Sequence, residues 1–174
     1  MSGRMLRTSF FVTCVCLLPV LAQAQKAVAD YDKEVDFSKF KTYAWQSGQP
    51  APSPLTHKRI VTAIDEQLAS KGMTQVESSP SAIIVYYAAV EEQKRLNAWG
   101  SGPRWSGFGT VTAETIRVGQ LVVDIYDAAT KQLVWRGSVS DTASDKPETN
   151  QKKIKEAIAK LFKQFPPAQG RNSD

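Results

Sequence analysis

Alternating hydrophobic and polar residues form the clearest pattern in the chain, over residues 119–140. Two runs with a period of two, rich in β-branched and aromatic side chains, flank the polar segment Asp127–Lys131. Such alternation indicates half-buried strands, and the polar segment between them indicates a turn. The pattern therefore predicts an antiparallel hairpin. Its predicted inward side chains are Leu121, Val123 and Ile125 from the first strand and Leu133, Trp135, Gly137 and Val139 from the second.

Two other segments carry apolar residues at helical spacing. The first begins at Ser53-Pro54, a typical helix start, and ends at Lys71-Gly72, a typical helix end. The second ends at Pro166-Pro167 and has the stronger amphipathic pattern. Each predicted helix therefore has one apolar stripe that must pack against another layer. The stripes comprise Ile60, Val61, Ile64 and Leu68 in the first helix, and Ile154, Ala157, Ile158, Leu161, Phe162 and Phe165 in the second.

Two further strands are predicted before the hairpin. Lys41–Trp45 follows two candidate core anchors, Phe37 and Phe40, and Ala82–Ala88 is apolar on both faces, as a central strand is. The passage from strand through helix to strand favours a right-handed crossover between parallel neighbours. We therefore predict an α+β fold. It is a two-layer sandwich in which a mixed four-stranded sheet (β-α-β-β-β-α) has both helices packed on one face.

Residues 91–114, which join the second predicted strand to the hairpin, show no hydrophobic period. Connections of this length in a compact domain are usually either functional or disordered. The segment carries aromatic side chains among glycines, whose backbone freedom suits a chain that orders on contact. We predict a binding site here; the alternative is that one or two of the rings cap the open face of the sheet. The predicted binding residues are Trp99, Arg104, Trp105 and Phe108.

The first 24 residues have the order of a secretory signal peptide. Arg4 and Arg7 precede an apolar run over residues 8–21, and Ala22-Gln-Ala24 follows as a small-residue cleavage site. We expect cleavage after Ala24, a periplasmic location, a single domain over residues 25–167 and a flexible tail over 168–174. No second apolar run reaches the length that a membrane-spanning helix needs.

Removal of the leader changes both the charge and the cysteine content. The leader holds two of the 22 basic residues and none of the 17 acidic ones, so the expected mature charge is 20 − 17 = +3. This value is ordinary for a soluble domain and does not require an anionic partner. Both cysteines, Cys14 and Cys16, lie in the leader and neither follows a lipidation box, which disfavours lipid anchoring at either position.

The sequence contains no phosphate-loop pattern, dinucleotide fingerprint or zinc-ligand spacing, so we predict no cofactor and no metal site. The single histidine, His57, is expected to pack at the edge of the first helical stripe. Alternating carboxylates in Asp30–Asp36 indicate a solvated edge segment, with cation binding as the alternative. Asp124 and Arg136 face outward on the hairpin, either as a cross-strand ion pair or as a holder of a ligand carboxylate.

A complete small core without a catalytic motif predicts a non-catalytic binding or interaction module. Its partner would be an envelope protein or a glycan or lipid ligand, whereas the compartment and the modest charge argue against nucleic acid. The alternative is a carboxylate-based envelope hydrolase, whose glycosidase version needs two carboxylates roughly 5 to 10 Å apart. Outward lysines on the second helix are either solvated or leave room for peripheral membrane contact. They are Lys152, Lys153, Lys155, Lys160 and Lys163.

Five ordered motifs, spread from about Val28 to Pro167, resemble a bacterial envelope family known as domain of unknown function 4136. The resemblance implies an exported protein or lipoprotein with no assigned activity. The order of elements is also similar to that of the lipopolysaccharide-assembly lipoproteins, an analogy of fold that transfers no function. The motifs are Asp36–Trp45, Leu68-x-x-Lys-Gly72, Gly119-x-Leu-Val-Val-Asp124, Leu133-Val-Trp-Arg-Gly137 and Phe165-Pro-Pro167.

Overall fold

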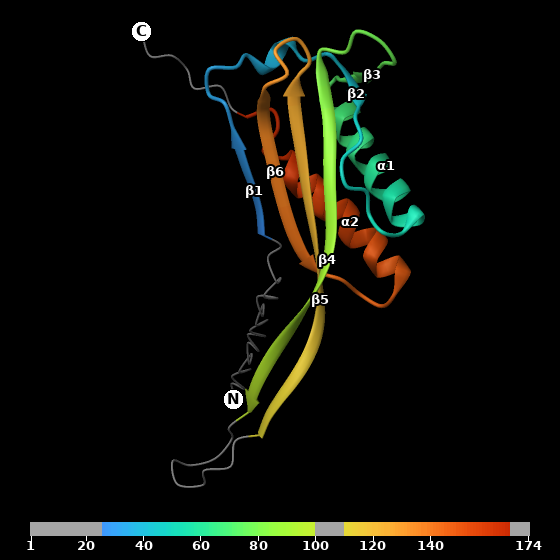
Figure 1. Ribbon diagram of the computed structural model, residues 1–174, viewed down its shortest axis with the longest axis vertical. Helices are drawn as coiled ribbons and strands as arrows, with labels where there is room; N and C mark the ends of the chain where they lie inside the picture. The colour runs from blue at the N-terminus through green and yellow to red at the C-terminus, as the bar shows by residue number, and fades with distance from the viewer. Residues whose placement is uncertain (1–25, 100–109, 168–174) are drawn as a thin grey trace, which may run out of the picture.

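The computed structural model describes residues 26–99 and 110–167, in which one mixed sheet carries both α-helices on one of its faces (Figure 1). The predicted α+β class and the two helices are confirmed, but the sheet has six strands rather than four, in the order β1-β6-β5-β4-β2-β3. The strands are β1 (Lys26–Tyr31), β2 (Thr42–Trp45), β3 (Thr74–Gln75), β4 (Ala82–Trp99), β5 (Thr110–Asp127) and β6 (Leu133–Thr142). The helices are α1 (Pro54–Ser70), α2 (Pro147–Phe162) and the short 3₁₀ helix η1 (Phe37–Lys39).

The two strands that the sequence pattern did not predict lie at the two edges of the sheet. β1 pairs antiparallel with β6, from Lys26 opposite Ser140 to Tyr31 opposite Trp135. β3 is two residues long and pairs in parallel with β2. β3 is too short to show a period, and the inward side chains of β1 are the small Ala27 and Ala29 before Tyr31, so neither strand has the run of large inward side chains by which a strand is detected in a sequence. Asp30, expected in a solvated segment, is exposed but belongs to β1.

The predicted crossover and the predicted hairpin are both present. β2 and β4, joined through α1, pair in parallel, with Tyr43 opposite Ala82. β5 and β6 pair antiparallel, but the register shifts between Ile125 and Tyr126. This irregularity turns Leu133 outward, where it is 38% exposed, so its predicted inward position is wrong. Val134 enters the core instead, because a bulge shifts the alternation of side chains between the two faces by one residue.

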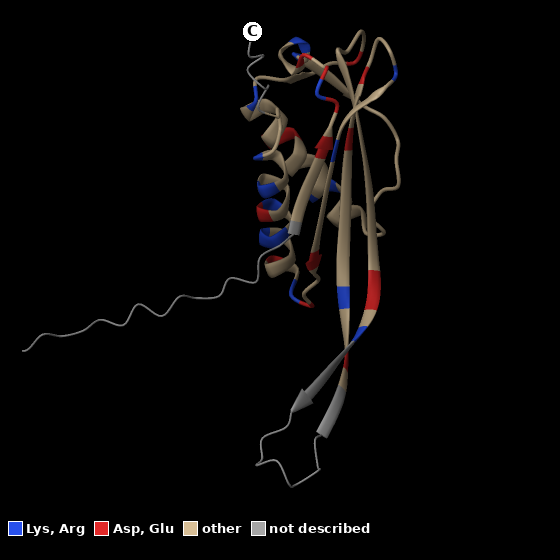
Figure 2. Ribbon diagram, turned by 90° about the vertical axis from the view of Figure 1, so that its left-hand side faces the viewer, with Lys and Arg blue, Asp and Glu red and all other residues tan. Residues whose placement is uncertain are grey.

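The segment 91–114 was predicted as a loop, and this prediction is wrong for most of its length. β4 and β5 remain paired from Ala82–Asp127 to Trp99–Thr110. Eight pairs, from Glu92–Arg117 outward, lie beyond the last pairing of β5 with β6 and form a two-stranded ribbon. We call residues 92–99 and 110–117 the arm; it extends away from the rest of the sheet (Figures 1 and 2). Eight residues of strand span about 25 Å. Side chains at its base are exposed on both faces, so no hydrophobic period marks these strands.

The core lies between the helices and the sheet, and Trp135 is the largest of its fully buried side chains. This side chain is fully buried, as predicted, with ring centroids 5.6 Å from Phe162 and 5.4 Å from Phe165. Its Nε1 donates to the carbonyl of Gln164 at 3.4 Å. A Cβ at Gly137 would lie 2.3 Å from the Trp135 ring and 2.7 Å from Leu161. Only glycine at this position lets α2 approach β6 so closely.

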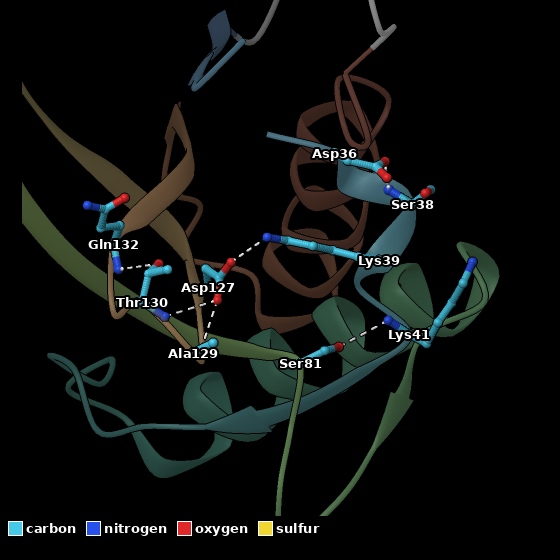
Figure 3. A network of polar contacts seen from close by, with 9 residues as sticks. All are labelled: Asp36, Ser38, Lys39, Lys41, Ser81, Asp127, Ala129, Thr130 and Gln132. Atoms are coloured by element: carbon cyan, nitrogen blue, oxygen red, sulfur yellow. Dashed lines mark hydrogen bonds and ion pairs between the residues drawn. The ribbon is translucent and has the colours of Figure 1, made fainter. Parts of the chain in front are cut away.

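A buried carboxylate, Asp127, fixes the turn that joins β5 to β6 (Figure 3). Its Oδ1 accepts the backbone N–H groups of Ala129 and Thr130 at 2.8 and 3.2 Å. Its Oδ2 accepts Lys39 Nζ at 2.6 Å, which ties the turn to η1. The hydrogen bond from Lys39, with help from the two amides, lowers the pKa of Asp127 below its usual value of 3.8. The sequence pattern marked Asp127 only as a turn residue.

Because the folded-state pKa of Asp127 is lowered, the carboxylate stabilises the fold above pH 3.8, and this stabilisation is lost as the pH falls through the lowered value. We expect Asp127→Asn to remove this part of the acid sensitivity. Urea unfolding between pH 7 and pH 2.5 should therefore show a smaller loss of stability for the variant than for the parent. The exposed carboxyl of Glu77 provides a matched control, Glu77→Gln, with the parent slope expected. Equal slopes for Asp127→Asn and the parent would contradict the assignment.

Candidate functional site

The four residues predicted for binding are only partly within the described structure. Trp99 is the last residue of β4, where its Cα pairs with that of Thr110 at the end of the arm. Arg104, Trp105 and Phe108 lie outside the described residues. The hypothesis that these four residues form a contact surface therefore stays a prediction. The described structure adds a second candidate that the sequence pattern did not indicate.

This second candidate is a pocket of about 270 Å³ between the first halves of α1 and α2 and the helix-facing side of the sheet. The pocket lies at the base of the arm, at the opposite end of the core from Trp135 and Phe162. Small side chains such as Ala88 and Ala157 occupy positions here at which larger ones would fill the space. The apolar lining includes Ala51, Ile60, Ala88, Leu121, Val139, Ile154 and Ala157.

The polar part of the pocket's rim is held by contacts between β6 and α2. Lys153 Nζ donates to the carbonyl of Thr142 at 2.6 Å and lies 3.5 Å from Asp141 Oδ1. Asn150 Oδ1 accepts the backbone N–H of Ser144 at 2.7 Å, which fixes the connection between the two elements. Arg117, at the base of the arm, completes the rim and pairs with Asp145, whose side chain is 93% exposed. The rim thus presents two cations and one carboxylate, Asp141.

The start of α1 forms the opposite wall, and the ring of Tyr86 holds it against β4. The Tyr86 hydroxyl accepts the backbone N–H of Ala51 at 3.3 Å and is hydrogen-bonded to His57 Nδ1. Burial raises the pKa of Tyr86. His57 lies in the first turn of α1 and stacks on Tyr86 with 5.7 Å between ring centroids, so this residue supports the wall. Ser53 is the N-cap residue, but its side chain does not cap the helix.

The predicted cross-strand ion pair of Asp124 and Arg136 is present on the sheet face opposite the helices. Arg136 Nε and Nη2 donate to the two carboxylate oxygens at 2.7 and 2.6 Å, which raises the pKa of the guanidinium. Asp124 is fully buried, and Tyr126 lies beside it with its hydroxyl 3.4 Å from Oδ2. Since both carboxylate oxygens bind the same guanidinium, the geometry supports a structural pair and not a holder of a ligand carboxylate.

Residues 26–99 and 110–167 contain no group of three or more His, Cys, Asp or Glu placed to bind a metal ion. Within the same ranges, no helix is long and apolar enough to cross a membrane. The lining of the pocket between α1, α2 and the sheet is mostly apolar, which suits a ligand; a second pocket, of about 340 Å³, lies against Phe37, Phe40 and Phe165.

Known structures share this fold. A PDZ-domain protein from Parabacteroides distasonis is similar at a TM-score of 0.55 and 14% identity, over 83% of this chain and 36% of that chain, so this chain spans about a third of that protein. Two structures of the PelC dodecamer from Paraburkholderia phytofirmans are similar at TM-scores of 0.52 and 0.50, with 11% and 10% identity. Each covers 80% of this chain and 95% of PelC. At these identities the similarity shows the fold alone.

No curated protein matches the chain in sequence. The family described as domain of unknown function DUF4136 matches residues 27–167, which include every strand and both α-helices of the structure except the first residue of β1. The match agrees with the resemblance carried by the five sequence motifs. The chain belongs to the family of the domain of unknown function DUF4136.

Proposed function

We propose that the protein is an exported envelope protein that acts by binding and takes an apolar group of its ligand into the pocket between α1, α2 and the sheet. The observation that carries the proposal is the pocket itself, an apolar space of about 270 Å³ rimmed by a few polar side chains. Concave sites with an apolar lining and few polar groups are the usual form of small-ligand sites. The arm, at whose base the pocket opens, is a second contact element in this proposal.

Export is supported by the basic, apolar and small-residue order of the first 24 residues. We expect mass spectrometry of the periplasmic fraction to find a chain that begins at Gln25. A full-length chain in the cytoplasm, or a chain with an acylated cysteine, would contradict this part of the proposal.

The described pocket gives little support to a hydrolase. A glycosidase needs one carboxyl group as the acid and another as the base or nucleophile, roughly 5 to 10 Å apart. The described lining of the pocket includes a single carboxylate, Asp141, and it is paired with Lys153. The geometry therefore favours binding over a reaction that depends on two carboxylates.

Filling the pocket is expected to abolish binding of a neutral apolar probe. In Ala157→Leu the added carbons enter the pocket space, so we expect the affinity for N-phenyl-1-naphthylamine to fall at least tenfold while the melting temperature is kept or rises. Probe fluorescence and thermal unfolding measure the two quantities. A matched control is Ala69→Leu, at an exposed position in the same helical layer, with parent affinity expected.

A second variant tests the same pocket in case Ala157→Leu does not fold. Ala88→Val adds two methyl groups to the pocket from β4 instead of α2, and the same loss of affinity is expected. Unchanged probe binding in both folded variants would refute the pocket as the ligand site.

A further inference from the structure

We infer that the pocket takes a single acyl chain with an anionic head group, that is, a fatty-acid-like amphiphile. This inference rests on the proposed binding function and narrows it to one class of ligand. Three observations support this inference. They are the size of the apolar space, the charge of the rim and the exposed start of α1 in the opposite wall of the pocket.

The apolar space matches one chain of moderate length. A volume of about 270 Å³ holds roughly nine groups of the size of a water molecule, at about 30 Å³ each. The apolar side chains come from both layers, with Ile60 from α1, Ile154 from α2 and Leu121 from β5. None of these three side chains is charged, so the inner end of the pocket suits a hydrocarbon.

The rim of the pocket favours an anion. Its charged lining residues are Arg117, Lys153 and Asp141, which sum to one net positive charge. The ion pair that Arg117 makes with Asp145 joins two exposed side chains, and pairs of this kind contribute little stability. The guanidinium is therefore available to a ligand head group at small cost.

The start of α1 adds to this preference. The first turn of α1 contains no acidic residue, and the side chain of Ser53 makes no cap to its amides. A helix start carries partial positive charge, which an anion beside it stabilises. The start of α2 contributes less, because Glu148 lies in its first turn. Ser53 and Thr56 belong to the wall opposite the rim cations, so an anionic head group at the mouth lies between the two while its chain points toward Ile60 and Leu121.

Three amphiphiles with the same ten-carbon chain and different head groups provide the test. Isothermal titration calorimetry, below the micelle concentration of each compound, would compare decanoate, neutral decanol and decyltrimethylammonium. We expect decanoate to bind at least tenfold more tightly than the cation, with decanol between them. In the double variant Arg117→Gln, Lys153→Gln the preference for decanoate should fall, with only the share from the start of α1 remaining, whereas decanol should bind as it does to the parent.

A matched control is Lys155→Gln, which removes a lysine of α2 that pairs with Glu66 outside the pocket. It should keep the full preference for decanoate. Equal binding of all three compounds would overturn the anionic class and leave the pocket as an apolar site. Binding of none, with a folded protein, would overturn the proposed function as well. A preference that is undiminished in the double variant would overturn the assignment of the rim cations.

Discussion

Trp135→Ala is expected to lower the free energy of unfolding by about 3 to 5 kcal/mol, the usual cost of truncating a fully buried tryptophan. The ring is completely buried between β6 and α2 and contacts both Phe162 and Phe165. Its removal leaves a cavity between β6 and α2. Because α2 already lies close to β6 at Gly137, a small shift of the helix cannot close this cavity. For a domain of this size, the melting temperature should fall by on the order of 10 °C.

Leu133 provides a matched control for this prediction, because it lies on the same strand but is 38% exposed. Leu133→Ala should cost less than about 1 kcal/mol, since surface truncations seldom have large effects. Urea unfolding of both variants and the parent at pH 7 measures the difference. If the two variants prove equally stable, the face assignment of β6 after the register shift is wrong.

Arg136→Leu is expected to have the second large effect, at about 3 kcal/mol. The substitution leaves the fully buried carboxylate of Asp124 without the guanidinium that binds both of its oxygens. Breaking a buried pair by removing one partner typically costs about 3 to 5 kcal/mol. We expect the lower end of this range, because the Arg136 side chain is half-exposed and water can replace part of it.

The double variant Asp124→Leu, Arg136→Leu distinguishes an uncompensated charge from lost packing. Replacing both partners by apolar side chains should recover most of the lost stability, because no buried charge remains. Lys155→Ala, which breaks an exposed pair with Glu66, should cost less than about 1 kcal/mol. Chemical unfolding of the three proteins gives the comparison. A double variant as unstable as Arg136→Leu alone would show that the ion pair is not the reason for the loss.

The core could be predicted from the sequence because its elements each bury one face. Residues 121–125 and the stripe that ends at Phe165 repeat with the period expected for their secondary structure, and the structure places both patterns in the same core. The crossover from β2 to β4 and the burial of Trp135 follow from the same patterns. Periodicity records burial, so it predicts the parts of the fold in which one face is buried and the other exposed.

The parts of the structure that the sequence pattern did not predict have no such contrast between a buried and an exposed face. The arm is exposed on both sides at its base, and β3 is too short to show a period. The bulge near Tyr126 moved Leu133 outward, although the alternation in the sequence continues through it. The pocket depends on alanines that distant segments bring together, Ala88 in β4 and Ala157 in α2. A small residue in a sequence does not indicate whether its neighbours in space fill the room that it leaves.

The strands β4 and β5 continue without a break from the sheet into the arm. The two strands pair without interruption over all 18 residues of each, and no register shift separates the arm from the part within the sheet. Residues on the inner part, from Ala88 to Val90 and from Gly119 to Leu121, form one wall of the pocket. The described end of the arm therefore lies about 30 Å along the strands from Val90 and Gly119 in this wall, so the arm and the wall are parts of one unbroken ribbon.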